Sequence, residues 1–114
     1  MKNTTININE ATIKNFVESI RPEDLEIREQ LDFGYSFEKN IAILYEIRPN
    51  WLDPKEKNHI EFAKIRFYKS KLEWNLYWMR ANEKWELYKP FPKSTHLDEI
   101  IQIIKKDING CFFG

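Results

Sequence analysis

Two stretches in which apolar and polar residues alternate, 31–47 and 60–88, constrain the fold of this chain most strongly. A period of two is typical of strands that bury one face. The apolar positions of the first stretch are Leu31, Phe33, Tyr35 and Phe37, then Ile41, Ile43, Tyr45 and Ile47. Residues 38–40 between the two sets form a three-residue link in this interpretation. The stretch therefore predicts a hairpin with one apolar face.

The second stretch contains a third strand at 60–68 and a hairpin at 74–88, which holds three of the four tryptophans. A turn centred on residues 81–82 would set Trp78 opposite Trp85 and Leu76 opposite Leu87. A turn centred on residues 70–71 would set Ala63 opposite Trp78. A small residue beside two indoles fits the volume alternation of a packed layer. We therefore interpret the tryptophans of this stretch as core residues.

Amphipathic helical segments flank the strands on both sides. The first follows the capping-box-like pair Asn7 and Glu10, and its apolar stripe is Ile13, Phe16, Val17 and Ile20. The second has the stripe Leu97, Ile100, Ile101, Ile104 and Ile108. We predict one α+β domain over residues 1–114: a five-stranded antiparallel meander with an N-terminal and a C-terminal helix packed on the tryptophan face. Phe112 or Phe113 is expected to dock between the second helix and the sheet.

Charge and composition exclude several classes of function. Eighteen basic and eighteen acidic residues cancel, so no global field directs the chain to nucleic acid or to an anionic membrane. No stretch approaches the roughly 18 apolar residues of a membrane span, and we expect a cytoplasmic protein without a membrane partner. His59, His96 and Cys111 lack the paired spacing of zinc ligands. We expect no metal and no cofactor.

The second face of the predicted sheet is the candidate binding surface, because both helices are expected on the tryptophan side. It would carry Arg48, Lys64 and Arg66 together with Tyr68, Tyr77 and Tyr88. Residues 60–89 hold seven basic and four acidic side chains, a local excess of three. Cations interleaved with rings can contact phosphates and stack on bases, which favours nucleic acid as the partner. The same charges can simply pair across strands, as Lys64 and Glu86 would.

Two further functions stay open beside non-catalytic binding of nucleic acid. Asp32, Glu46 and Lys64 are expected on the second face, where two carboxylates and a lysine would suit a metal-dependent hydrolase or nuclease. Their spacing matches no nuclease motif. Trp51 lies in the longest predicted loop, residues 48–59, and can anchor another protein or fold back as a lid over the sheet edge. We favour the lid, because an exposed loop tryptophan is a liability in a soluble protein.

Several short motifs carry a family resemblance. They are residues 30–35 (QLDFGY), residues 46–51 (EIRPNW) with Asp53 and Pro54, the pairs Ala63–Lys64, Tyr77–Trp78, Arg80–Ala81 and Lys84–Trp85, the aromatics Trp74 and Tyr88, and the ending GCFFG at 110–114. From Arg21 onward the chain resembles the bacterial family called domain of unknown function 3024. The resemblance implies a small stand-alone domain. It supplies no catalytic residues.

Overall fold

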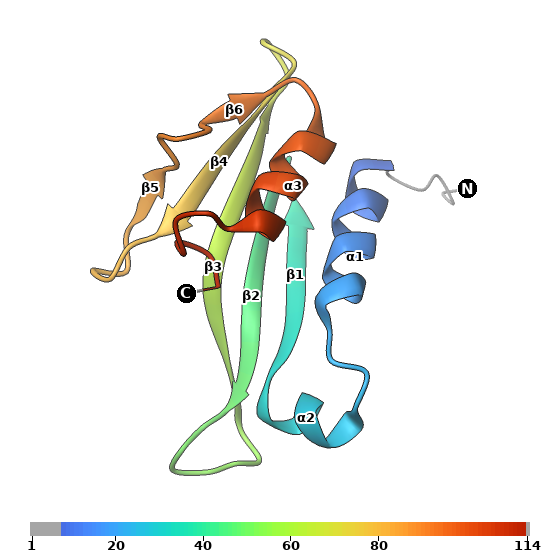
Figure 1. Ribbon diagram of the computed structural model, residues 1–114, viewed down its shortest axis with the longest axis vertical. Coiled ribbons are helices and arrows are strands. Elements are labelled where there is room, and N and C mark those ends of the chain that lie inside the picture. The colour runs from blue at the N-terminus through green and yellow to red at the C-terminus, as the bar shows by residue number, and fades with distance from the viewer. Residues whose placement is uncertain (1–7, 114) are drawn as a thin grey trace.

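An antiparallel sheet with two helices on one face makes up the described part of the computed structural model, residues 8–113 (Figure 1). The elements are α1 (Ile8–Ile20), α2 (Leu25–Gln30), β1 (Asp32–Glu38), β2 (Ile41–Pro49), β3 (Lys57–Tyr68), β4 (Glu73–Met79), β5 (Trp85–Leu87), β6 (Lys93–Ser94) and α3 (Leu97–Lys106). The strand order is β1 to β5 in sequence, and β6 pairs with β4 beside β5. The predicted α+β meander with its N-terminal and C-terminal helices is confirmed. Asn7 of the expected capping pair lies outside the described residues.

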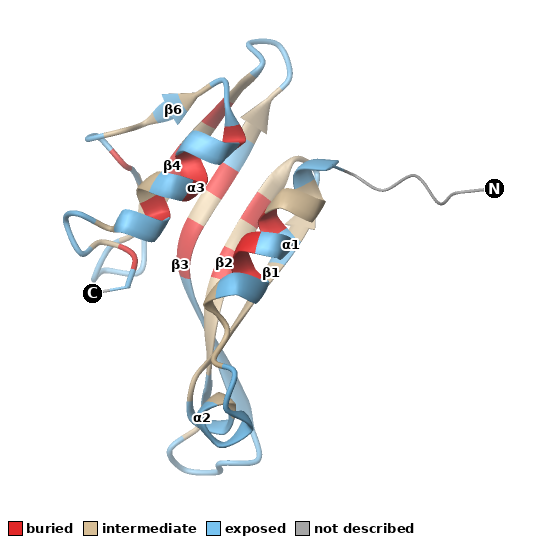
Figure 2. Ribbon diagram, turned by 45° about the vertical axis from the view of Figure 1, so that its right-hand side comes forward, coloured by how far each residue is buried: buried red, intermediate tan, exposed pale blue. Residues whose placement is uncertain are grey.

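The core lies between the sheet and the helices α1 and α3, which sit side by side (Figure 2). The completely buried side chains of the sheet are Ala42, Leu44, Ala63, Ile65 and Leu76. Those of the helices are Ile13, Ile100 and Ile104. Ala63 faces Trp78 across β3 and β4, as predicted. The β3–β4 register therefore places Trp74, Leu76 and Trp78 on the helix side of the sheet.

The β1–β2 turn is one residue shorter than predicted. The side chains of β2 therefore point to the faces opposite to those predicted. Lys39 and Asn40 both have positive φ, 53° and 65°, and they form a two-residue loop that pairs Glu38 with Ile41. Phe37 consequently faces Ala42, not Ile41. Because a shift of one residue turns every side chain of a strand to the opposite face, Ala42 and Leu44 enter the core. The isoleucines of β2 and Tyr45 lie on the other face.

The β4–β5 turn is one residue longer than predicted, with the same kind of consequence. The Arg80 amide donates to the Lys84 carbonyl, and Glu83 has a φ of 64°, which gives a three-residue loop. Trp85 therefore faces Met79, and Trp78 faces Glu86. The predicted pairing of Trp78 with Trp85 is wrong. Trp85 and Leu87 belong to the face that the helices leave open.

The C-terminal end is anchored as predicted, through Phe112. Its side chain is buried, and its ring centroid lies 5.0 Å from that of Tyr88. Asp107, the residue that ends α3 with a φ of 43°, accepts hydrogen bonds from the amides of Phe112 and Phe113 at 3.0 and 2.8 Å. Since α3 ends before this turn, Ile108 is exposed and does not belong to the predicted apolar stripe.

The β2–β3 hairpin extends beyond the helices as a two-stranded arm (Figure 1). Pairing continues to Pro49 and Lys57, so the loop spans residues 50–56 and is shorter than the predicted 48–59. A bulge between Leu44 and Tyr45 lets the neighbouring residues Phe62 and Ala63 both be buried. The Lys57 ammonium reaches the Glu29 carboxylate of α2 at 3.2 Å. This contact ties the arm to α2.

Candidate functional site: the open face of the sheet

The face opposite α1 and α3 is not covered by another layer of the described residues (Figure 1). Register places two rows of side chains across it. The first row is Ser36, Ile43, Lys64, Tyr77 and Leu87, and the second is Glu38, Ile41, Arg66, Asn75 and Lys93. Two cations therefore stand in the middle of a surface whose other members are largely apolar, aromatic or uncharged.

Both central cations lie over aromatic rings. The Lys64 ammonium is 4.6 Å from the centre of the Tyr77 ring and 5.7 Å from that of Trp85. The Arg66 guanidinium carbon is 4.6 Å from the centre of the Tyr68 ring. We call these five residues, Lys64, Arg66, Tyr68, Tyr77 and Trp85, the basic–aromatic strip. Ring–cation contacts at exposed sites contribute only about 0.5–1 kcal/mol, so a ligand can displace them.

A hydrogen bond joins the two halves of the strip. The hydroxyl groups of Tyr68 and Tyr77 are 3.1 Å apart. Burial, and then this hydrogen bond, raise the pKa of Tyr77 above its ordinary value, so the phenol is neutral at physiological pH. Two rings whose hydroxyl groups bind one another present flat surfaces between positively charged side chains.

Of the predicted surface residues, the structure brings Lys64, Arg66, Tyr68 and Tyr77 together. Tyr88 was expected beside them, and this placement is wrong: its side chain is 3% exposed on the helix side and accepts a hydrogen bond from Asn109. The extra residue in the β4–β5 loop is the cause. The same shift brings Trp85, which was expected in the core, into the strip.

Arg48 is also separated from the strip. Its Nε lies 2.9 Å from Glu46 Oε1, near the free end of the arm. Arg66 pairs with Ile41, which lies seven residues before Arg48 along β2. This separation corresponds to about 23 Å of strand. The two arginines belong to paired strands, as expected, but they lie at opposite ends of the β2–β3 pairing, so Arg48 does not join the surface around Arg66.

The candidate hydrolase residues are not assembled into one site. Asp32 faces Ile47 and Glu46 faces Phe33, so neighbouring positions of two paired strands direct the carboxylates to opposite faces. Asp32 is held by Arg21, whose Nε and Nη2 donate to its two oxygens at 2.9 Å. Within residues 8–113, no cluster of three or more His, Cys, Asp or Glu is suited to a metal ion.

Trp51 does not act as a lid. It is 86% exposed, and Leu52 beside it is exposed as well. The loop that carries them is nevertheless ordered: the Asn50 side chain accepts from the Leu52 amide at 2.8 Å, and the Asn50 amide donates to the Glu56 carbonyl at 2.9 Å. The loop hydrogen-bonds to itself, and its two large apolar side chains point to solvent.

Comparisons with known proteins place the chain by family alone. No curated protein and no solved structure matches it. The part of the chain that the structure describes contains no helix of the length and apolar character that a membrane crossing requires. One family model, DUF3024, described as a domain of unknown function, matches residues 1–114. The chain therefore belongs to the DUF3024 family.

Proposed function

We propose that this protein is a non-catalytic binding module and that its open sheet face takes single-stranded nucleic acid. The observation that carries the proposal is the basic–aromatic strip, in which Lys64 and Arg66 lie over three rings on an uncovered sheet. Open sheets with this combination bind single strands by stacking bases on the rings and contacting phosphates with the cations.

The geometry lets each cation exchange one partner for another. In the free protein Lys64 and Arg66 lie over Tyr77, Trp85 and Tyr68. When a base stacks on a ring, the flexible side chain above it can move to the neighbouring phosphate. Stacking contributes about 1–3 kcal/mol per base, which exceeds the ring–cation contact that it replaces. The exchange is therefore favourable, and it requires no sequence-specific hydrogen bond.

A titration at two salt concentrations tests the proposal. Labelled single-stranded DNA and RNA are titrated with the parent protein and with a Lys64→Met/Arg66→Met variant at about 50 and 200 mM salt. We expect the parent to bind and its affinity to fall with salt. Loss of two phosphate contacts should reduce the slope of log affinity against log salt by about 1.4, since each contact on a single strand contributes about 0.7.

The matched control removes the same charge from the other side of the molecule. Lys105 and Lys106 are exposed in the last turn of α3, so a Lys105→Met/Lys106→Met variant should bind as the parent does. Absence of parent affinity at low salt, or equal losses in the two double variants, would contradict the proposal.

Trp51 supports a second candidate function, the binding of another protein through the arm. A large ring that is 86% exposed on an ordered loop resembles the aromatic anchors found at protein interfaces. A photo-reactive residue in place of Leu52 should cross-link a partner at high salt, and Trp51→Ala should abolish the product. Leu72→Ala is the control, because Leu72 is another exposed apolar turn residue. Equal products from both variants would argue against an anchor at Trp51.

A further inference from the structure

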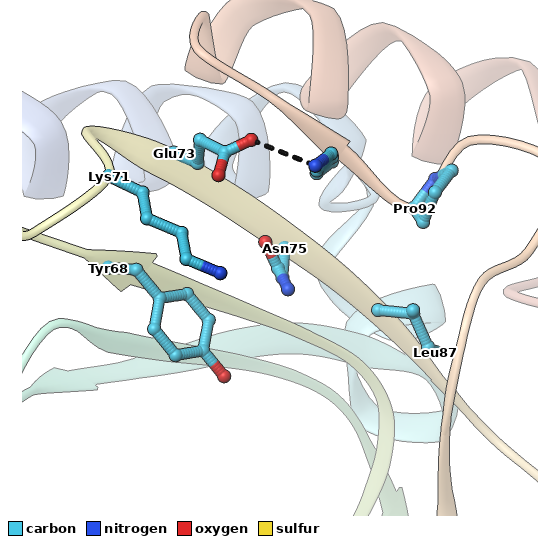
Figure 3. A pocket seen from close by; sticks show the side chains of 7 residues that line it. Tyr68, Lys71, Glu73, Asn75, Leu87 and Pro92 are labelled. Atoms are coloured by element: carbon cyan, nitrogen blue, oxygen red, sulfur yellow. Dashed lines mark ion pairs between the residues drawn. The ribbon is translucent and has the colours of Figure 1, made fainter.

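A hollow of about 360 Å³ opens on the same face, between the β3–β4 turn and the edge formed by β5 and β6 (Figure 3). Leu87 of β5 pairs with Tyr77, and Lys93 of β6 pairs with Asn75. The segment between β5 and β6, residues 88–92, is not part of either strand. The side chains of Leu87, Asn75 and Lys93 all line the hollow. Its volume is near the lower end of the range of about 300–1,000 Å³ for small-molecule sites.

The walls of the hollow combine an apolar part with a positively charged part. The ring of Tyr68 lies across from Leu87 and Pro92, and the Lys71 ammonium points toward Asn75 between them (Figure 3). These apolar and aromatic surfaces suit a flat ring, and the amide of Asn75 offers both a donor and an acceptor.

The charge of the hollow favours an anion. Lys93 is paired with Glu73 at 3.4 Å. Among residues 8–113, Lys71 makes no ion pair. Two ammonium groups against one carboxylate leave a net charge of +1 within the lining. A ligand with a flat ring and one anionic group therefore complements the site.

We propose that this hollow takes one nucleotide, with its base between Tyr68 and the Leu87–Pro92 wall and its phosphate at Lys71. The proposal rests on the proposed function, because Tyr68 belongs both to the hollow and to the basic–aromatic strip. The hydrogen bond between the hydroxyl groups of Tyr68 and Tyr77 makes the two sites continuous. The hollow is then the point at which a bound strand is held by more than stacking.

The test uses nucleotides that are too small to span the strip. The full chain, labelled with ¹⁵N, is titrated by NMR with adenosine monophosphate, uridine monophosphate, the corresponding nucleosides and inorganic phosphate. We expect the monophosphates to shift the amide signals of Tyr68, Asn75 and Leu87. The nucleosides should bind at least about tenfold more weakly, because a charge-assisted contact is lost.

A pair of lysine variants locates the phosphate. Lys71→Met should reduce monophosphate affinity by about tenfold or more. Lys69→Met is the matched control, since Lys69 is exposed in the same turn and outside the lining of the hollow, and it should leave the affinity unchanged. Equal effects of the two variants would overturn the assignment of the phosphate to Lys71.

The remaining outcomes separate this inference from the proposed function. If oligonucleotides bind but the monophosphates do not, and Lys71→Met is without effect, the nucleotide site is wrong and the strip stands. If the monophosphates bind in the hollow but no oligonucleotide binds, the proposed function is wrong and the nucleotide site stands. If inorganic phosphate binds as tightly as the monophosphates, the base makes no contribution and the nucleotide assignment is overturned.

Discussion

Two leucines on neighbouring strands show how differently the faces of the sheet are used. Leu76 of β4 is 0% exposed on the helix side, whereas Leu87 of β5 is 36% exposed on the open side. The helix side is held by close packing, which tolerates few changes. The open side is held by ring–cation contacts and one hydroxyl pair, which a ligand can replace at small cost. Stability and proposed binding thus depend on separate sets of side chains.

The largest difference between the two faces is expected when Leu76 and Leu87 are truncated separately. Leu76→Ala should lower the free energy of unfolding by about 2–5 kcal/mol, because it leaves a cavity in a closed core. Leu87→Ala should lower it by less than about 1 kcal/mol, since its side chain is already partly hydrated. Urea denaturation of both variants measures the difference. Similar losses would show that a further layer covers the open face.

A smaller effect is expected at Gly34, where the ring of Tyr45 packs closely against the strand. A Cβ at this position would lie 2.8 Å from Cε1 of Tyr45, whose ring is stacked on His59 at 4.3 Å. Gly34→Ala should therefore destabilise the protein by about 1–3 kcal/mol.

The same substitution in a Tyr45→Ala background is the control, because the obstructing ring is then absent. The cost of Gly34→Ala should nearly vanish there, and a double-mutant cycle measures the coupling. An equal cost in both backgrounds would mean that the backbone, and not the ring, resists the change.

The smallest effect concerns the charged contact between Arg21, the residue after α1, and Asp32 of β1. Hydrogen bonds from Arg21 hold the pKa of Asp32 below its ordinary value of 3.8. Because the pKa is lower in the folded state, the stabilisation is complete above that ordinary value and is lost as the pH falls through the folded value. Arg21→Met should cost about 1 kcal/mol or less at pH 7.

The pH dependence distinguishes this pair from a packing effect. Denaturation of the parent and of Arg21→Met at several pH values should give a constant difference above about pH 5, which narrows below about pH 4. Lys106→Met, at an exposed position of α3, should differ from the parent by a pH-independent amount. A difference for Arg21→Met that persists unchanged into acid would show that the guanidinium acts by packing alone.

The positions of the strands and helices are predicted well from the sequence. The faces to which their side chains point are predicted less well. Periodicity locates the strands and both long helices, and the four-residue β3–β4 turn pairs Ala63 with Trp78 as expected. The β1–β2 and β4–β5 hairpins depend on loops of two and three residues that contain no glycine, and Lys39, Asn40 and Glu83 adopt positive φ instead. No glycine marks these turn positions in the sequence. An error of one residue in the predicted loop length then assigns every side chain of the following strand to the wrong face.

Strand β2 adds a second ambiguity, because it is apolar on both faces. Ala42 and Leu44 enter the core while Ile41 and Ile43 lie on the open face. Hydrophobicity alone does not distinguish these two pairs. Trp85 was predicted in the core and lies on the open face, whereas Tyr88 was predicted on the open face and is buried. Both residues are aromatic, so residue type does not indicate which of them is buried. The exposure of Trp51 depends on hydrogen bonds within its loop, and periodicity does not report on those.

The divided last strand has a consequence for how copies of the molecule meet. β5 has three residues and β6 has two, and the segment between them contains Pro90 and Pro92. Proline donates no amide hydrogen bond, and a short broken edge offers little template for a strand from another chain. Fibre-like growth through backbone pairing is therefore blocked at this side of the sheet, which leaves β1 as the edge at which aggregation would have to begin.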